Sequence, residues 1–336
     1  MHWLNRLSMV AALGFAAAFP AVAATTIKIA TVAPEGTTWM REMRTSSEAV
    51  KKATDGRVEI KYYPGGVMGD DATVLRKIKI GQLQGGAFTG GEATIITGDA
   101  QVYSLPFMYR NQDEIDKLRA KLDPLLKQQF AKAGYELLGV SGGGFAYLMS
   151  TRDIKTRDDL KAAKVWVPQG DTVAEVVFKV AGVAPISLPL SDVYTSLQTG
   201  LIDTAANTPS GAIAFQWHTK LKHMIDLPLT YVVGLIAVDK KVIDALSPED
   251  RKALDDAFAA GFERLDKANR ADNASALEAL KQQGIGITTP DAGDRKTWES
   301  VGIESFKVLS DQGTFSAEML KAQAAALAEI RGGTAK

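Results

Sequence analysis

A candidate nucleophilic serine lies near the middle of the chain. Residues 139–143 (GVSGG) match G-x-S-x-G, the pattern that presents a nucleophilic serine in α/β-hydrolases. That chemistry needs a strand, a sharp turn and a helix around the serine, and a histidine as its base. The following residues, 145–151, alternate as a strand does, and only His218 and His223 remain after residue 24. We predict that the chain is not an enzyme, and a serine hydrolase using Ser141 is a remote alternative.

The sequence offers little that would hold a metal ion or a cofactor. It contains no cysteine, which removes thiolate ligands and disulfides. His218 and His223 are five residues apart, so they do not share a helix face, and the pattern H-E-x-x-H does not occur. The phosphate-binding pattern G-x-x-x-x-G-K-[ST] does not occur either. We therefore predict no metal site and no cofactor.

The balance of charge argues against one class of partner. The chain has 39 lysines and arginines and 39 aspartates and glutamates. A domain that binds nucleic acid usually has a basic excess, so we expect no nucleic acid partner. After residue 24 no segment is apolar enough to span a membrane, which takes about 20 apolar residues. The roughly 310 residues that remain suffice for two domains with cores of their own.

Residues 1–24 have the features of a secretory signal peptide. A short basic start and an apolar, alanine-rich run over residues 7–22 precede the small-residue sequence AVA at 21–23. The apolar run has about 16 residues, which is too short for a membrane-spanning helix. We predict export to the periplasm, with cleavage near Ala23 or Ala24. Lipid attachment at a lipobox is excluded because the sequence has no cysteine.

The elements that would position a bound molecule are clearest in residues 158–209. Strand and helix alternate there, which is typical of a parallel α/β sheet, and ligands bind at the carboxyl ends of such strands. Trp166 and Asn207 both lie near such an end. The predicted elements are a strand at 164–167 stopped by Pro168, a helix to Lys179 capped by Asp171, a helix from Ser191 with Val193, Leu197 and Leu201 on one face, and a strand at 204–207.

The rest of the chain also reads as alternating strands and helices. Residues 247–250 (SPED) form a good helix start, and no clear break follows before Gly284, which predicts a helix of about 35 residues and roughly 50 Å. The alternative is two helices broken near Asn273. Other predictions are a strand–helix–strand unit at 27–63, a helix at 70–80, a strand at 85–88, helices at 112–122 and 124–133, and crossing strands at 135–140 and 227–242.

Several segments resemble one family in the expected order. AKVWVPQGD at 163–171, LSDVYTSLQTGLID at 190–203 and AANTP at 205–209 are similar to the solute receptors of tripartite ATP-independent periplasmic (TRAP) transporters. KYYPGGVMGDD at 61–71, SLPFMYR at 104–110 and DLPLTYVVGLIAVDKK at 226–241 extend the resemblance over nearly all of the chain after residue 25. The resemblance implies a two-domain α/β receptor with a ligand cleft between the domains and a long helix bracing both.

The chain departs from the family at the position where a substrate carboxylate is usually bound. The family usually has an arginine in the strand at 164–167, and this sequence has Trp166 there. Phe145 falls where many relatives carry a second arginine. Without a cationic partner, a buried carboxylate loses hydration that nothing replaces. We therefore expect a neutral or largely apolar solute, unless Arg41 or Arg152 serves a carboxylate. The expected contacts are Trp166, Asn207, Phe145, Thr89, Gly90, Val32, Glu35, Trp39, Gln169, Leu190 and Trp217.

The resemblance also implies how the domains and partners are arranged. The first domain would comprise residues 25–143 with 232–270, and the second residues 144–231 with 271–330. The solute would be passed to the membrane subunits of a TRAP permease. A carrier of lipids or other hydrophobic molecules that serves a different partner is a further alternative.

Overall fold

The first strands and helices form one end of the main sheet. β1 (Thr25–Thr31) lies between β2 (Val58–Tyr63) and β3 (Gly85–Thr89), and both pairings are parallel. α1 (Thr38–Ala53) and α2 (Asp71–Lys79) connect these strands, which confirms the predicted strand–helix–strand beginning.

The computed structural model describes residues 24–332. The predicted signal peptide therefore lies outside the described residues, apart from Ala24.

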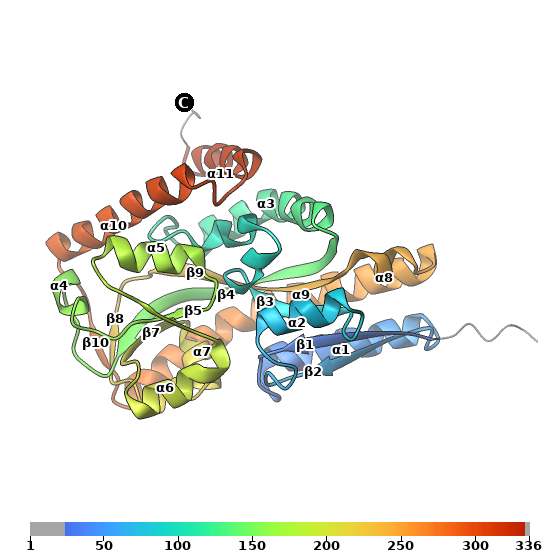
Figure 1. Ribbon diagram of the computed structural model, residues 1–336, viewed down its shortest axis with the longest axis horizontal. Coiled ribbons are helices and arrows are strands. Elements are labelled where there is room, and N and C mark those ends of the chain that lie inside the picture. Colours follow the sequence, from blue (N-terminus) through green and yellow to red (C-terminus); the bar gives the residue numbers. More distant parts are fainter. Residues whose placement is uncertain (1–23, 333–336) are drawn as a thin grey trace, which may run out of the picture.

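Two long strands carry the sheet from one lobe to the other (Figure 1). β4 (Tyr135–Ser150) and β9 (Thr230–Asp239) are antiparallel partners, because the chain crosses to the second lobe along one and returns along the other. The far end of β4 pairs with β7 (Thr204–Asn207) and β8 (His223–Ile225), also antiparallel. The sheet is therefore mixed, and β7, which lies in the stretch whose alternation favoured a parallel sheet, pairs antiparallel with β4. The strand order is β10 (Gly286–Thr288), β8, β4, β9, β3, β1, β2, with β7 on β4.

The second lobe adds a two-stranded parallel sheet, β5 (Trp166–Pro168) with β6 (Ile186–Leu188). The helix after β5 begins as predicted, because Asp171 Oδ1 accepts a hydrogen bond from Ala174 N at 2.8 Å. The helix after Ser191 ends at Gly200, which has a φ of 71°, so Leu201 lies beyond it and is 50% exposed, contrary to its predicted place on the buried face. The helical elements are α4 (Arg157–Leu160), α5 (Thr172–Val180), η3 (Leu190–Asp192), α6 (Val193–Thr199), α7 (Pro209–Ala214) and η4 (Trp217–Thr219).

A proline does not divide the helix that covers the first lobe. The sequence predicts two helices separated near Asp123, but α3 (Gln112–Lys132) is continuous through Pro124. Asp123 accepts hydrogen bonds from Tyr103 and Arg119, and Leu118, Leu122 and Leu126 are buried, so tertiary contacts outweigh the local effect of the proline. Two 3₁₀ helices, η1 (Glu92–Ile95) and η2 (Gly98–Ser104), link β3 to α3.

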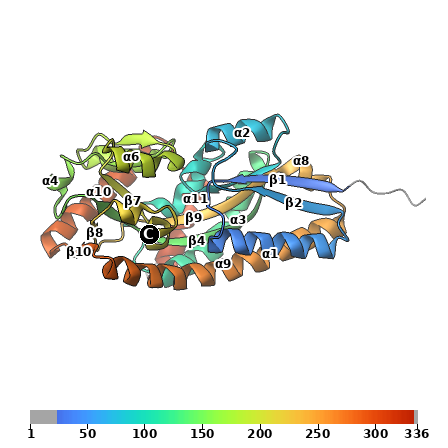
Figure 2. The same ribbon diagram turned by 90° about the horizontal axis from the view of Figure 1, so that it is seen from below.

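One helix spans both lobes. α9 (Pro248–Gln282) is 35 residues long and unbroken, as predicted, and Ser247 Oγ caps it by accepting from Asp250 N at 3.1 Å. It contacts α1 in the first lobe, the crossing strand β4, and α7 in the second lobe. Figure 2 shows α9 running along one side of the molecule beneath both lobes. The chain ends with α10 (Ala292–Asp311), which packs on α5, and α11 (Ala317–Ile330), which packs on α3; the short α8 (Lys240–Asp244) precedes α9.

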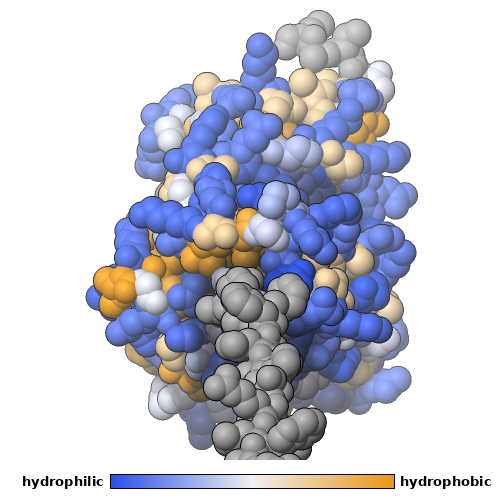
Figure 3. Space-filling model, turned by 90° about the vertical axis from the view of Figure 1, so that its right-hand side faces the viewer, coloured by the Kyte–Doolittle hydropathy of each residue, from blue (hydrophilic) through white to orange (hydrophobic). Residues whose placement is uncertain are grey.

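Apolar residues are concentrated inside the molecule, in clusters that lie on both faces of the sheet and in the second lobe. The end view in Figure 3 shows a mostly hydrophilic surface with smaller apolar areas. Within residues 24–332, no helix is both long enough and apolar enough to cross a membrane.

Candidate ligand-binding cleft

A cavity of about 820 Å³ lies where the two lobes meet. This volume falls in the range of pockets that hold small organic molecules, roughly 300–1,000 Å³. Its walls come from the loop after β1, the end of β3, the crossing strands, the ends of β5 and β7, and one side of α9. The position agrees with the expectation that ligands bind near carboxyl ends of strands.

The wall from the first lobe includes three of the predicted residues, Val32, Glu35 and Trp39. Glu35 is exposed and forms two hydrogen bonds with Arg44, at 2.7 and 2.9 Å, which lower the pKa of its carboxyl. Trp39 packs edge-on against Phe262, with ring centroids 6.0 Å apart. Its indole nitrogen is buried and has no hydrogen-bond partner within the described residues. Glu35 is therefore paired with Arg44, and Trp39 presents apolar ring surface to the cavity because its indole N–H is buried.

Thr89 and Gly90 line the cavity at the end of β3. Thr89 N donates to Glu92 Oε2 at 2.8 Å, and Glu92 N donates back to Thr89 Oγ1 at 3.3 Å, so the two residues are bonded reciprocally where β3 leads into η1. A side chain at Gly90 would place Cβ 2.7 Å from the carbonyl oxygen of Ala100. Glycine at position 90 is therefore required by packing within the first lobe.

Trp166 forms part of both the cavity wall and the core beneath it. It is 5% exposed, and its ring stands perpendicular to that of Trp217, with centroids 5.3 Å apart. Its indole N–H donates to the carbonyl oxygen of Leu188 at 2.9 Å. Because that donor is already used, Trp166 presents only apolar ring surface to the cavity, and it cannot replace an arginine as a carboxylate partner.

Asn207 has a free donor group at the end of β7. Its Oδ1 accepts from Thr208 N at 2.8 Å, and within the described part of the chain its amide nitrogen donates to no protein acceptor. Thr208 Oγ1 accepts from Gly211 N at 3.1 Å and so caps α7. Asn207 and Leu190 both line the cavity, and the Asn207 amide is the better placed of the two for an orienting hydrogen bond.

Three predicted contact residues are not part of the cavity wall. Trp217 is 1% exposed and lies behind Trp166 in the core. Phe145 packs edge-on against Tyr231, with ring centroids 5.1 Å apart. Gln169 is exposed in the turn before α5. All three are close in sequence to lining residues, but the alternation of strand side chains and the depth of the core place them elsewhere.

Sequence reasoning missed the contribution of α9, which was treated as a brace. Asn269, Asp272, Ser275, Ala276 and Ala279 of this helix line the cavity. Asn269, Asp272, Ala276 and Ala279 follow at intervals of three, four and three, which places them on one helix face, and Ser275 lies beside Ala276. The run of small and polar residues within an otherwise amphipathic helix was the signal available in the sequence. Further lining residues that were not predicted include Phe88, Asp171, Val177, Phe215 and Leu229.

Charged groups in the cavity wall are mostly acidic. Among residues 24–332, four carboxyl residues line it, Glu35, Glu92, Asp171 and Asp272, against one basic residue, Arg41. Arg41 is exposed and donates to Gly36 O at 2.6 Å and to Thr38 Oγ1 at 2.7 Å, and that hydroxyl donates to Asp272 Oδ2 at 2.6 Å. Arg152, the other cation considered from the sequence, lies outside the wall and pairs with Asp203 at 3.6 Å.

Two of these carboxyls are buried without a basic partner in the described residues. Burial raises the pKa of Glu92, and burial together with the charge of Glu92 raises the pKa of Asp71 next to it. Burial also raises the pKa of Asp171 to about 6, although it accepts hydrogen bonds from Ala174 and Gln101. The cavity wall near Gly91 is therefore an unfavourable place for a carboxylate carried by the ligand.

Ser141 does not have the surroundings of a catalytic serine. It lies inside β4, which continues to Ser150, so the strand–turn–helix that a nucleophile elbow requires is not formed. Its Oγ accepts a hydrogen bond from Asn269 at 3.1 Å. His218 instead bonds the carbonyl oxygen of Ala212. Among residues 24–332, no group of three or more histidine, aspartate and glutamate side chains is placed to hold a metal ion.

A family model described as "Bacterial extracellular solute-binding protein, family 7" matches residues 29–310. The chain is 25% identical over 330 residues to the C4-dicarboxylate-binding periplasmic protein DctP of Rhodobacter capsulatus, an alignment that covers 97% of this chain and 98% of the relative.

Solved structures share the fold at lower identity. A TRAP periplasmic solute-binding protein from Desulfovibrio salexigens with bound orotic acid superposes with a TM-score of 0.85 at 19% identity, covering 91% of this chain and 99% of that one. A second, from Xanthobacter autotrophicus with bound β-D-galacturonate, has a TM-score of 0.82 at 21% identity, covering 90% and 99%. The two-lobed α/β fold is thus shared with these structures.

Proposed function

This chain belongs to the bacterial extracellular solute-binding proteins of family 7, the receptors of TRAP transporters, and we propose that its solute carries no carboxylate and is neutral or largely apolar. Members of the family are receptors and not enzymes; they bind small organic solutes and deliver them to membrane permease subunits. Ser141 is therefore not assigned the role of a nucleophile.

The observation that carries the proposal is the scarcity of cations in the cavity wall. Arg41 is its single basic residue among the described residues, against four carboxyls, and it already donates to Gly36 and Thr38. Burying an ionised carboxylate without a cation costs several kcal/mol, whereas an arginine fork compensates that cost with paired hydrogen bonds. Trp166 supplies apolar area instead, and its N–H is bonded to Leu188 O.

The relatives bind a different class of molecule. Orotic acid, β-D-galacturonate and C4-dicarboxylates are all anionic at neutral pH. The proposed solute therefore differs in charge from the molecules that these relatives bind, and the residues of this cleft are the reason for proposing it. A carboxylate held by Arg41 is the second candidate, because Arg41 does line the cavity, at its exposed side.

Calorimetric titration with succinate and pyruvate tests the proposal, with Arg41→Ala as a matched variant. We expect neither acid to bind at micromolar concentrations. Tight binding that is lost in Arg41→Ala would favour the second candidate. Tight binding that persists in Arg41→Ala would refute both readings of the site.

We propose that Trp166, Val32, Trp39 and Leu190 contact the solute through apolar surface, and that Asn207 and Thr89 orient it through polar groups.

We propose that the first domain comprises residues 25–143 with 232–270, and the second residues 144–231 with 271–330. The pairing of β1–β3 with β9, and of β7–β8 with the far end of β4, supports this division. α11 is the exception, since it packs on α3 of the first lobe.

The family is extracellular or periplasmic. We propose that this chain is exported to the periplasm and that its signal peptide is cleaved near Ala23 or Ala24. The sequence AVA at 21–23 supports this site. N-terminal sequencing of protein from the periplasmic fraction is expected to begin at Ala24 or Thr25, and an intact Met1 there would contradict it.

A further inference from the structure

The helix that spans both lobes presents a polar stripe to the crossing strand. Asp266, Asn269 and Asn273 follow one another along α9 at intervals of three and four residues, so they share one helix face. That face lies against residues 141–144 of β4, the serine and three glycines at which the chain crosses between lobes. The three side chains together contact nearly every peptide group of this segment.

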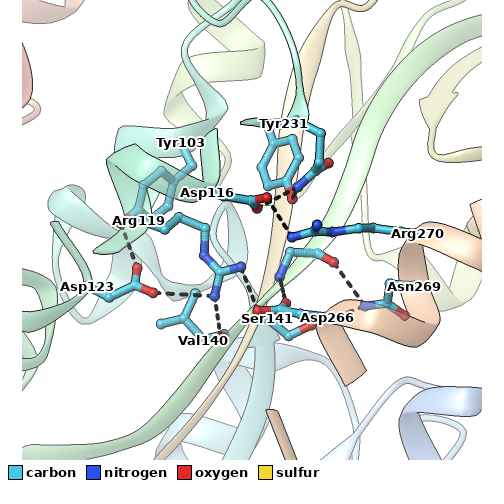
Figure 4. Close-up of polar contacts among 12 residues, drawn as sticks. Tyr103, Asp116, Arg119, Asp123, Val140, Ser141, Tyr231, Asp266, Asn269 and Arg270 are labelled. Atoms are coloured by element: carbon cyan, nitrogen blue, oxygen red, sulfur yellow. Dashed lines mark hydrogen bonds and ion pairs between the residues drawn. The ribbon is translucent and has the colours of Figure 1, made fainter. Parts of the chain in front are cut away.

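Asp266 and Asn269 hold the first half of the crossing (Figure 4). Asp266 Oδ1 accepts from Gly142 N at 2.6 Å, and Asp266 Oδ2 accepts from Arg119 Nη1 at 3.0 Å. Arg119 is buried and also donates to the carbonyl oxygen of Val140 at 2.6 Å. Asn269 Nδ2 donates to Ser141 Oγ at 3.1 Å and to Gly142 O at 2.9 Å.

Asn273 connects the crossing to the second lobe. Its Nδ2 donates to Gly143 O at 2.6 Å, and its Oδ1 accepts from both Ser210 N, at 3.2 Å, and Ser210 Oγ, at 2.9 Å. Gly143 and Ser210 line the cavity, whereas Asn273 does not. One amide therefore fixes the spacing between two cavity-lining elements, β4 and the first turn of α7.

The strand itself is irregular at this place. The register of β4 against β9 shifts between Gly142 and Gly144, and Gly144 has a φ of 111°. A bulge interrupts the ladder of hydrogen bonds between strands and permits bending. The side chains of α9 thus bond a segment that the sheet holds only weakly.

We propose that Asn273 is a positioning residue which, with Asp266 and Asn269, clamps the crossing strand and sets the angle between the two lobes around the cleft. The proposal rests on the receptor function proposed above, but it does not depend on the class of solute. In receptors of two lobes, the population of open and closed forms decides when the ligand is enclosed. A helix that bonds both the hinge and the second lobe is placed to bias that population.

Interlobe distances measured in the solute-free protein test this. The chain has no cysteine, so Gln82→Cys and Gln198→Cys, both exposed and one in each lobe, give a clean pair of sites for spin labels. Double electron–electron resonance then reports the distance distribution in this background, with Asn273→Ala, with Asn273→Asp, and with Lys267→Ala. Lys267 is exposed on the same helix and pairs with Glu263, so it is the matched control.

We expect Asn273→Ala to raise the population outside the main distance peak by roughly fivefold or more, the ratio that loss of one ordinary hydrogen bond produces. Asn273→Asp is expected to broaden the distribution too, because it cannot donate to Gly143 O. If Asn273→Ala does not fold, the distance distribution of Asn273→Asp tests the proposal instead. Lys267→Ala is expected to leave the distribution unchanged.

Distributions for Asn273→Ala or Asn273→Asp that superpose on the background, in folded protein, would overturn the proposal. A lower melting temperature without a change in distance would give Asn273 a purely structural role and would overturn it as well. Because the distances are measured after the co-purified solute has been removed, failure here is distinguishable from failure of the proposed solute class, which the titrations with succinate and pyruvate decide.

Discussion

At the scale of single residues, Trp166 is the side chain on which the proposed solute class depends most. Its ring forms cavity wall and its N–H is bonded to Leu188 O, so it contributes area and shape. Trp166→Ala is expected to weaken binding of the solute that co-purifies with the protein by about 2–4 kcal/mol, the range for a well-packed aromatic contact. Calorimetry measures the change in affinity.

Trp217→Phe is the control, since Trp217 lies behind Trp166 and outside the cavity wall. It perturbs the same core cluster but is expected to leave the affinity nearly unchanged. Equal losses in the two variants would mean that Trp166 acts only through the core, and succinate or pyruvate binding that survives Trp166→Ala would refute its proposed role.

Asp171 makes stability depend on pH. Burial raises its pKa from 3.8 to about 6, so between these values the folded state binds more protons than the unfolded state. Stability therefore decreases as pH rises through this window and the loss is complete above it. Since one pKa unit corresponds to about 1.4 kcal/mol, the effect is on the order of 2–3 kcal/mol.

Asp171→Asn isolates this effect, because asparagine keeps the oxygen that caps α5 and removes the titration. Thermal unfolding from pH 4 to pH 7 is expected to show a flatter profile for the variant than for the parent. Parallel profiles would show that Asp171 does not titrate in this range.

At the residue scale, the sequence reports a position best where a side chain follows directly from the end of a strand. Trp166, Asn207, Thr89 and Val32 were placed at strand ends by sequence and do line the cavity. Phe145 was expected as a contact from its place in the family resemblance. Its place against Tyr231 depends on the register of β4 with β9, including two bulges, and no local pattern in the sequence reports that register.

At the scale of elements, the crossing strand β4 is the one whose geometry is most demanding. Gly144 has a φ of 111°, and a Cβ there would lie 2.6 Å from Asn273 Nδ2. Gly144→Ala is expected to destabilise the protein by about 1–3 kcal/mol, from backbone strain together with the displaced amide. Chemical denaturation gives the free energy of unfolding.

Gly284→Ala serves as the matched variant for strain alone, because Gly284 has a φ of 84° and a Cβ there would meet nothing within 4 Å. We expect a smaller loss of stability in Gly284→Ala than in Gly144→Ala. If the two losses were equal, contact with Asn273 would contribute nothing at this position.

An element could be predicted where its sequence signal lies within the element itself. It could not be predicted where contacts with residues distant in the sequence determine it. The caps Asp171 and Ser247 are bonded as expected, since an N-cap needs only the next turn of its own helix. The continuity of α3 through Pro124 depends on Arg119 and Tyr103 holding Asp123. The antiparallel crossing of β4 and β9 follows from partners about 90 residues apart, which strand–helix alternation cannot reveal.

At the scale of the whole molecule, two lobes and a shared cavity predict closure around a solute. A ligand in the cleft contacts both lobes only when they approach each other, so it favours the closed form. Small-angle scattering is expected to give a smaller radius of gyration with the co-purified solute than after its removal by partial unfolding and refolding. Identical values in the two states would contradict a hinge at the crossing strands.

The measurement that tests the central claim most directly is identification of the molecule bound to the native protein. Protein purified from the periplasm without added ligands would be examined by native mass spectrometry, and the released small molecules identified. Because the described residues contribute four carboxyls and one engaged arginine to the cavity wall, we predict an uncharged or largely apolar organic molecule in stoichiometric amount. A stoichiometric dicarboxylate, 2-oxo acid or sugar acid would contradict the proposed solute class.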